Sequence, residues 1–252
     1  MIGTQTASPV MEQTDYVGEL ETEHHTAKNI DISSRAAAVV KEREVPELDF
    51  KYDPKPVYSF VKRFADIFLS LMALIMLSPL FLVVSAAIFI RDPGNPFFSH
   101  YRVGRNGKKF KMYKFRSMYK DAEERKAELM AANECKGANF KMADDPRIIG
   151  KLGKFIRKSS IDELPQLVNI LKGDMSVIGP RPFVPDEQDK LPKERLLVRP
   201  GLSCYWQING KNELSEEMAN YYDLKYIMDR SAATDVKIIL KTVEVVLKSS
   251  NS

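Results

Sequence analysis

The stretch 159–182 combines two adjacent carboxylates with nearby cations. Asp162 and Glu163 follow a basic run, and a GPRP turn at 179–182 comes after them. The prolines restrict the backbone around Arg181, and a guanidinium held in one direction suits bidentate recognition of phosphate. The stretch therefore predicts an anion site with a metal-binding pair, in which Asp162 could be a nucleophile or a metal ligand.

The local sequence around the two carboxylates predicts a helix start. Ser160 and Glu163 fit the S-x-x-E capping box, and Pro165 is tolerated without cost only in a first turn, so the helix should begin between Ser160 and Asp162. Free backbone N–H groups there favour phosphate and keep a carboxylate ionised. The alternative is that these residues only cap a helix and that the arginines are solvated charges.

A β-hairpin is expected to position a further cation. Its strands would span 97–103 and 109–118, and the Asn-Gly pair in the turn at 104–107 is a strong hairpin signal. Lys114 and Arg116 share an otherwise apolar face of the second strand, which is costly unless an anion meets them. A lysine that reaches solvent from an edge strand is the alternative for Lys114.

Two helices are expected to lie near a membrane surface. The segment 151–158 alternates cations with apolar residues, which suits a helix on anionic headgroups or facing a phosphate. Arg157 is in it, five residues before Asp162. The last helix, 235–248, is apolar but interrupted by charges, so it should lie on a membrane or pack on the body and cannot span.

One segment is apolar enough to enter a bilayer. Residues 67–90 are 24 consecutive residues without a charge, which is long enough for a transmembrane helix. Ser78 and Pro79 lie at its middle. Proline removes one backbone hydrogen bond and bends the helix, and the serine hydroxyl can satisfy the freed carbonyl.

Charges on both sides of this segment bear on its orientation. Basic residues precede and follow it, so both ends carry the mark of the cytoplasmic side. A re-entrant helix broken at Ser78 and Pro79 would satisfy both ends, and each half would rise roughly 17 Å into a core of about 30 Å. A kinked helix that spans the membrane is the alternative.

Composition narrows the class of protein. The chain has 252 residues and 44% hydrophobic content, enough for one core and an anchor. Six acids and two bases give residues 1–40 a charge of −4. The net charge of the whole chain is +4, so residues 41–252 carry +8. A basic body suits anionic lipid or a nucleotide, and without a nucleic-acid-binding motif no nucleic-acid partner is expected. Residues 1–56 are polar and aperiodic, which predicts a disordered tail and linker.

The central stretch of the sequence resembles a known protein family. The stretch 144–182, DDPRIIGKLGKFIRKSSIDELPQLVNILKGDMSVIGPRP, closely resembles the signature of the bacterial sugar transferases, the monotopic phosphoglycosyl transferases that load a sugar phosphate onto polyprenyl phosphate. The resemblance extends over 57–248, through the hairpin at 97–118 and the late loop at 199–212. In that loop Cys204 stands where many relatives have glycine.

The resemblance implies an architecture. We expect an α+β, mostly helical monotopic membrane protein with a re-entrant membrane helix, amphipathic interface helices and a small β-hairpin. With the tail at 1–56, the anchor would span 57–93 and the catalytic domain 94–252. The protein would lie at the inner membrane with its catalytic domain on the cytoplasmic face.

The resemblance also implies an activity. Sugar-1-phosphate would pass from a UDP-sugar to polyprenyl (undecaprenyl) phosphate, giving polyprenyl-diphospho-sugar and UMP, as the first membrane step of exopolysaccharide, capsule or O-antigen synthesis. Asp162 would hold the phosphosugar covalently and Glu163 would bind Mg2+. Lys114, Arg157 and Arg181 would bind the phosphates. The donor, the acceptor lipid, the bilayer and downstream glycosyltransferases are the expected partners.

Two functions from other classes are kept as alternatives. A membrane-tethered regulator of polysaccharide export, with the acidic tail as its working part, would release no UMP from UDP-sugars. A Mg2+-dependent phosphatase using the same aspartate would hydrolyse its substrate without a lipid acceptor. The transferred sugar does not follow from these residues.

Overall fold

The computed structural model describes residues 45–129, 145–209 and 214–250. The chain divides into two compact units, Met1–Val45 and Pro46–Ser252, and apart from Val45 all described residues belong to the second. The prediction of a disordered tail at 1–56 falls, up to residue 44, outside the described residues. The second unit has the predicted α+β character, with one long apolar helix, shorter helices and two small sheets.

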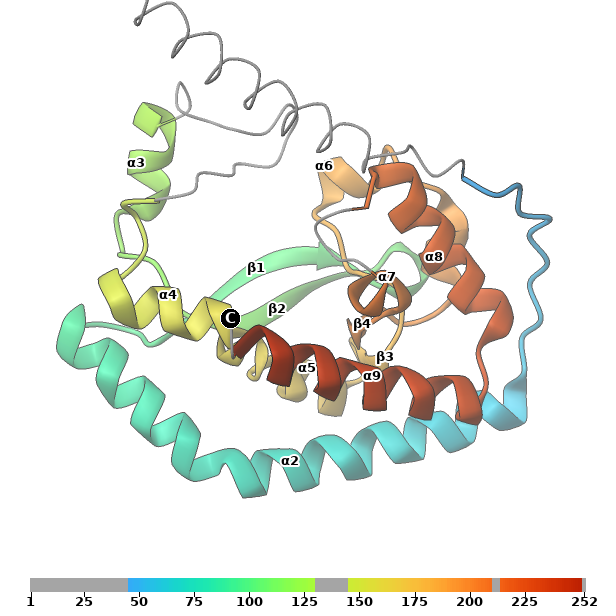
Figure 1. The fold of residues 1–252 in the computed structure, drawn as a ribbon, viewed down its shortest axis with the longest axis horizontal. Helices are drawn as coiled ribbons and strands as arrows, with labels where there is room; N and C mark the ends of the chain where they lie inside the picture. Colours follow the sequence, from blue (N-terminus) through green and yellow to red (C-terminus); the bar gives the residue numbers. More distant parts are fainter. Residues whose placement is uncertain (1–44, 130–144, 210–213, 251–252) are drawn as a thin grey trace, which may run out of the picture. The chain divides into compact units, whose positions relative to one another are not determined.

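The longest element is α2 (Pro56–Arg91), which follows the lower edge of Figure 1. Pro56 stands at its first position, where the missing N–H costs nothing. The helix is long and apolar enough to cross a membrane by length and composition, and 11% of its most apolar window is buried. The apolar run predicted at 67–90 is therefore helical and largely exposed.

The predicted break in this helix is a bend within one continuous element. The helix continues through Pro79, and Figure 1 shows that it bends in its middle part. Proline cannot donate to the carbonyl of Ile75, and the hydroxyl of Ser78 donates to that oxygen instead, at 2.8 Å. Ser78 thus removes the unsatisfied acceptor that Pro79 creates.

The hairpin consists of β1 (Phe97–Val103) and β2 (Lys109–Phe115), which pair antiparallel around a turn at Arg105–Gly107. Asn106 (φ 57°) and Gly107 (φ 75°) take the left-handed conformations that Asn-Gly turns favour. The second strand was expected to reach residue 118 but ends earlier, because Met118 leaves the hairpin and bridges to Ile148.

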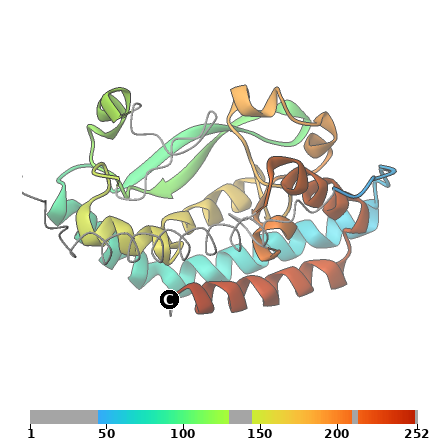
Figure 2. The same cartoon turned by 45° about the horizontal axis from the view of Figure 1, so that its top comes forward.

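The remaining elements surround the hairpin and α2 (Figures 1 and 2). In chain order they are α3 (Ala122–Leu129), α4 (Gly150–Lys158), η3 (Ile161–Glu163), α5 (Gln166–Lys172), β3 (Ser176–Ile178), α6 (Pro185–Gln188), η4 (Lys193–Leu197), β4 (Gly201–Ser203), α7 (Tyr205–Ile208), α8 (Glu216–Asp229) and α9 (Ala232–Ser250). Figure 2 shows α2 and α9 along one side of this unit, α4 and α5 next to α2, and the hairpin on the other side.

Both halves of α2 pack on this body. Ile88, in its second half, is fully buried with Phe115 of the hairpin and Ile156 of α4. Further toward its N-terminus, Leu77 packs against a cluster that contains Ile170 of α5. The helix α4 is formed as predicted, although its Phe155 is 59% exposed rather than buried.

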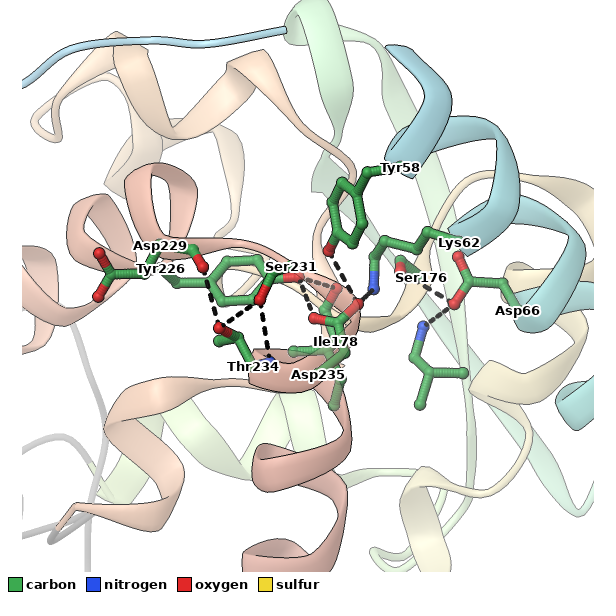
Figure 3. A network of polar contacts seen from close by, with 11 residues as sticks. Tyr58, Lys62, Asp66, Ser176, Ile178, Tyr226, Asp229, Ser231, Thr234 and Asp235 are labelled. Carbon is green, nitrogen blue, oxygen red and sulfur yellow. Dashed lines mark hydrogen bonds and ion pairs between the residues drawn. The ribbon is translucent and has the colours of Figure 1, made fainter. Parts of the chain in front are cut away.

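The first turns of α2 are tied to the C-terminal helices by the polar network in Figure 3. Asp235 of α9 accepts hydrogen bonds from the Tyr58 hydroxyl (2.8 Å) and the Lys62 ammonium (2.7 Å). The hydroxyl of Tyr226, on α8, lies 2.8 Å from the other oxygen of Asp235. Further along α2, buried Asp66 accepts from the Ser176 hydroxyl at 3.1 Å.

A short parallel sheet places the GPRP turn next to the late loop. Strands β3 and β4 pair in parallel, with Ser176 opposite Gly201 and Ile178 opposite Ser203. A Cβ on Gly201 would lie 2.1 Å from the backbone nitrogen of Gly179, so the two paired backbones approach each other too closely there for a side chain. The turn at 179–182 therefore starts from a fixed position.

An apolar surface covers the outward sides of α2 and α9. On α9 the exposed side chains are Val236, Leu240 and Val243, 53–66% exposed, while Ile238 is buried on the body. The last helix therefore packs on the body and presents a second apolar stripe outward. The exposed side chains of α2 include Phe60, Phe64, Phe68, Ile75, Met76, Leu82, Val83, Phe89 and Ile90. Such a surface indicates association with a membrane.

Candidate functional site

Lys114 joins the two adjacent carboxylates. Its ammonium lies 3.3 Å from Oδ2 of Asp162 and 2.9 Å from Oε1 of Glu163. The lysine comes from β2 and the acids from the turn η3, which contacts this strand. The anion expected opposite Lys114 is thus the predicted acidic pair, so the lysine does not simply extend to solvent from an edge strand.

The acidic pair does not stand at a helix start, which corrects the prediction. Ser160 adopts a left-handed conformation (φ 56°) and its side chain makes no capping hydrogen bond. The two acids lie in a single 3-10 turn, and α5 begins later, at Gln166, with Pro165 immediately before it. The capping-box alternative is therefore wrong, and a left-handed residue positions the acids instead.

Burial raises the pKa of the Asp162 carboxyl above its ordinary value. The attraction of Lys114 opposes that shift, and repulsion from Glu163 adds to it. A helix N-terminus was expected to stabilise the ionised form of Asp162. The acid instead lies in a short 3-10 turn, where burial destabilises the ionised form. A raised pKa marks a carboxylate whose charge is incompletely compensated by the protein.

Asp162 borders a cavity of about 290 Å³ that is rich in basic side chains. We call it the cationic cavity. Lys114 and Arg157 line it together with His100, Arg102, Arg116 and Lys120, and the aromatic rings of Phe98 and Tyr119 form part of its wall. The sequence predicted an anion opposite Arg116 without naming it, and the structure shows an ion pair between Arg116 and Asp92 at 3.0 Å.

Three side-chain nitrogens in the cationic cavity lack hydrogen-bond partners. Nε2 of His100 and the Nε atoms of Arg102 and Arg116 are buried, and none of them has a hydrogen-bond partner among the described residues. Burial, and then repulsion from Arg102 and Lys114, lowers the pKa of His100 to about 4, so the imidazole is neutral at pH 7. Unpaired buried polar groups are costly, and an anionic ligand with several acceptor oxygens would satisfy them.

Arg181 lies outside this lining and stacks on an aromatic ring. Its guanidinium carbon is 4.8 Å from the centroid of Trp206, the only tryptophan of the chain. Trp206 is 8% exposed and therefore belongs to the core. The structure thus brings Lys114, Arg157, Asp162 and Glu163 together and leaves Arg181 outside the lining, close enough to Arg102 for its charge to lower the pKa of that guanidinium.

A buried ion pair that sequence reasoning missed holds the backbone of Arg181. Arg195 and Asp223 lie 2.6 Å apart with side chains 1% exposed. Arg195 also donates to the carbonyl of Arg181 at 2.9 Å, and Asp223 accepts from its backbone N–H at 3.4 Å. The segment 186–199 is charged, which is typical of a surface segment, and no local signal distinguishes Arg195 from its neighbours.

The oxygen ligands of the acidic pair bear on the predicted binding of Mg2+. The described residues contain no group of three or more His, Cys, Asp or Glu side chains placed to hold a metal. Mg2+ is commonly held by one or two carboxylates together with water and substrate phosphate oxygens. Asp162 and Glu163 supply such oxygen ligands, so the donor set fits Mg2+ bound together with a phosphorylated substrate.

Comparison with known proteins adds independent findings. Residues 57–249 match the family described as bacterial sugar transferase. The galactosyl transferase CpsE of Streptococcus agalactiae serotype III is 48% identical over 193 residues, which are 74% of this chain and 42% of that protein. An undecaprenyl-phosphate galactose phosphotransferase of Salmonella typhimurium is 42% identical over 196 residues, 75% of this chain and 41% of the relative.

A third relative matches over most of its own length. The exopolysaccharide production protein ExoY of Sinorhizobium fredii is 38% identical over 205 residues, 79% of this chain and 90% of that protein. The chain therefore spans less than half the length of the first two relatives and about nine tenths of the third.

Proposed function

Because the chain belongs to the bacterial sugar transferase family, we propose that it transfers a sugar-1-phosphate from a UDP-sugar to polyprenyl phosphate. The products are polyprenyl-diphospho-sugar and UMP, in the first membrane step of exopolysaccharide, capsule or O-antigen synthesis. The observation that carries this proposal is a desolvated aspartate, paired with Lys114, at the edge of the cationic cavity.

The donor diphosphate occupies the cationic cavity. Lys114, Arg157 and Arg102 neutralise its charge, and the unpaired nitrogens of Arg102 and His100 donate hydrogen bonds to its oxygens, His100 in its Nε2–H tautomer. Charge neutralisation must precede nucleophilic attack, because a carboxylate and a diphosphate repel each other. Arg181, outside the lining but near Arg102, binds a part of the donor that extends beyond the cavity.

The chemistry takes two displacement steps. An oxygen of Asp162 attacks the sugar-linked phosphorus, the new O–P bond forms, and the bond to the bridging oxygen breaks so that UMP leaves with the electron pair. An oxygen of polyprenyl phosphate then attacks the same phosphorus. The O–P bond to the carboxylate breaks, and Asp162 returns as a carboxylate.

Glu163 would hold Mg2+ when the donor is bound, and Asp162 remains the nucleophile. The ion would supply Lewis-acid neutralisation of the phosphate oxygens. Lys114 occupies the space between the carboxylates in the present structure, so it shares this neutralising role. Chelation of Mg2+ with EDTA is expected to stop turnover, and restoring Mg2+ is expected to recover it.

The helix α2 enters one leaflet of the inner membrane and returns to the cytoplasmic face. Contacts near both of its ends support this arrangement. Arg63 donates to the carbonyls of Ile170 and Leu171 (2.6 and 2.9 Å), and just beyond the other end Asp92 pairs with Arg116. A helix of this length rises ~54 Å if straight, so a spanning helix could not keep both ends on one folded body.

The test is UMP release by the purified chain in detergent, with Mg2+, undecaprenyl phosphate and a panel of UDP-sugars. UDP-galactose comes first, because galactose appears in the names of two relatives. The expected result is UMP in equal amount to a lipid-linked phosphosugar. Release of no UMP from any donor would favour a regulatory role, and steady hydrolysis without the lipid would favour a phosphatase.

A further inference from the structure

Glu163 borders a second cavity, and we propose that this cavity binds the first isoprene units of the acceptor lipid. It has a volume of about 260 Å³ and extends from the acidic turn to α9. We call it the apolar cavity, and it is bounded by Glu163, Leu164, Leu202, Ile239, Thr242 and Val243 among others. The proposal deepens the proposed function and rests on it.

The two cavities meet the acidic turn at neighbouring residues. Asp162 lines the cationic cavity and Glu163 lines the apolar one, while Lys114 contacts both carboxylates. A phosphate at the polar end of the apolar cavity would therefore lie one side chain away from the nucleophile. Ser160 borders this same end, and its hydroxyl can donate to a phosphate oxygen, whereas the hydroxyl of Ser159 already donates to the carbonyl of Phe155 at 2.7 Å.

The lining of the apolar cavity suits a hydrocarbon rather than a nucleotide. Among the described residues that line it there is no lysine, arginine or histidine. Two of the polar groups farther in pair with each other, since the hydroxyls of Ser203 and Thr242 lie 2.6 Å apart. A diphosphate placed there would lose its hydration without gaining a cation, whereas isoprene units would bury apolar surface.

The apolar cavity continues onto the membrane-facing surface. Val243 lines the cavity and is also 53% exposed, and Leu240 and Val236 extend the exposed stripe along α9. An acceptor whose phosphate lies beside Glu163 can therefore pass its chain along the cavity and out over α9 into lipid. This continuity commits the site to a molecule with a charged head and a long apolar tail.

The first experiment fills the cavity. Ile239 lines it, while Leu82 of α2 is 73% exposed, lies outside both linings and is away from the proposed path of the acceptor, so Ile239→Trp and Leu82→Trp form a matched pair. Ile239→Trp is expected to raise the KM for undecaprenyl phosphate about tenfold or more, and to leave the single-turnover release of UMP without acceptor unchanged. Leu82→Trp should change neither. An unchanged KM in Ile239→Trp, or equal changes in both variants, would overturn the proposal.

The second experiment needs no variant, so it stands if Ile239→Trp misfolds. Wild-type protein in phosphatidylglycerol nanodiscs is irradiated with polyprenyl phosphate that carries a diazirine in its first isoprene unit. Labelling of peptides that contain 202–207 or 239–243, competed by undecaprenyl phosphate, is the expected result. Labelling confined to α2, or equal competition by added phosphatidylglycerol, would overturn it. Labelling can be scored even if no UDP-sugar releases UMP, so failure of the proposed function is distinguishable.

Discussion

Two lysine–carboxylate clusters in this molecule use the same chemical groups differently. At the α2–α9 contact, the single carboxylate of Asp235 is met by Lys62 and two tyrosine hydroxyls (Figure 3). At the acidic turn, Lys114 alone serves two carboxylates. Side-chain exposure is 13–15% in the Lys62–Asp235 pair and 14–32% in the Lys114 cluster, so burial does not distinguish them.

The balance of donors and acceptors does distinguish the two clusters. Asp235 of α9 is met by three donors from α2 and α8, so its charge is compensated in holding these three helices together. Asp162 shares its cation with Glu163 and borders a cavity, which leaves charge available to a ligand. We infer that an acid beside a cavity whose charge is only partly compensated marks the functional cluster. An acid whose charge is fully compensated by neighbouring donors marks the structural one.

The largest expected effect is on turnover in Asp162→Asn. The substitution removes the nucleophile, so activity should fall by about 1,000-fold or more. The free energy of unfolding should change by less than about 1 kcal/mol, because a desolvated charge is lost together with its attraction to Lys114. UMP release and chemical denaturation in detergent measure the two effects. A large loss of stability would show that this acid is structural.

Lys114→Met should lower turnover by about 100-fold, since one stabilising cation is removed from the transferring phosphoryl group. It should also change the pH profile. Lys114 lowers the pKa of Asp162, so its removal raises that pKa further, and the ionised nucleophile is lost at a higher pH as the solution is acidified. The acid limb of the pH–rate profile should therefore move upward. An unmoved limb would contradict the role given to Lys114.

Asp235→Asn makes the same change, aspartate to asparagine, in the cluster that joins α2 and α9. It leaves the partly buried Lys62 without its counterion, which should lower the free energy of unfolding by about 2–3 kcal/mol. Activity per folded molecule should stay within about twofold, because neither Asp235 nor Lys62 lines either cavity. Denaturation and active-site titration separate the two effects. Loss of activity in fully folded protein would break the comparison.

The smallest effect is expected for Arg181→Lys. The charge remains, but the planar stacking on Trp206 and the bidentate geometry are lost, which should cost about 1 kcal/mol, or roughly fivefold in kcat/KM for the donor. The KM for the lipid acceptor should not change. Steady-state kinetics with each substrate varied in turn provide the check, and an effect on the acceptor alone would contradict the assignment to the donor.

Features with a local cause were predictable from the sequence. The Asn-Gly pair predicted the hairpin, and hydrophobic periodicity predicted the amphipathic helix that carries Arg157. The Ser78 hydroxyl bonds the carbonyl that Pro79 frees, because both residues act within one helical turn. The neighbouring acids and Lys114 were also identified, although the contact between them depends on the fold.

Features with a distant cause were not predictable. Ser160 has the left-handed conformation that places the acidic turn, yet its residue type and spacing favour a helix cap. Arg195 appears in a charged segment, and its partner Asp223 belongs to a later helix. Asp66 precedes an apolar run, and its acceptor role depends on the distant Ser176. In each case the decisive partner is supplied by tertiary structure.

The central claim is that Asp162 carries the phosphosugar between donor and lipid. Wild-type protein would be incubated without acceptor with a UDP-sugar labelled on the sugar-linked phosphate, then quenched, digested and mapped by mass spectrometry. The account predicts one phosphosugar on the peptide that contains Asp162, lost when undecaprenyl phosphate is added and absent in Asp162→Asn. Lipid-linked product that forms with no label on that aspartate would contradict it.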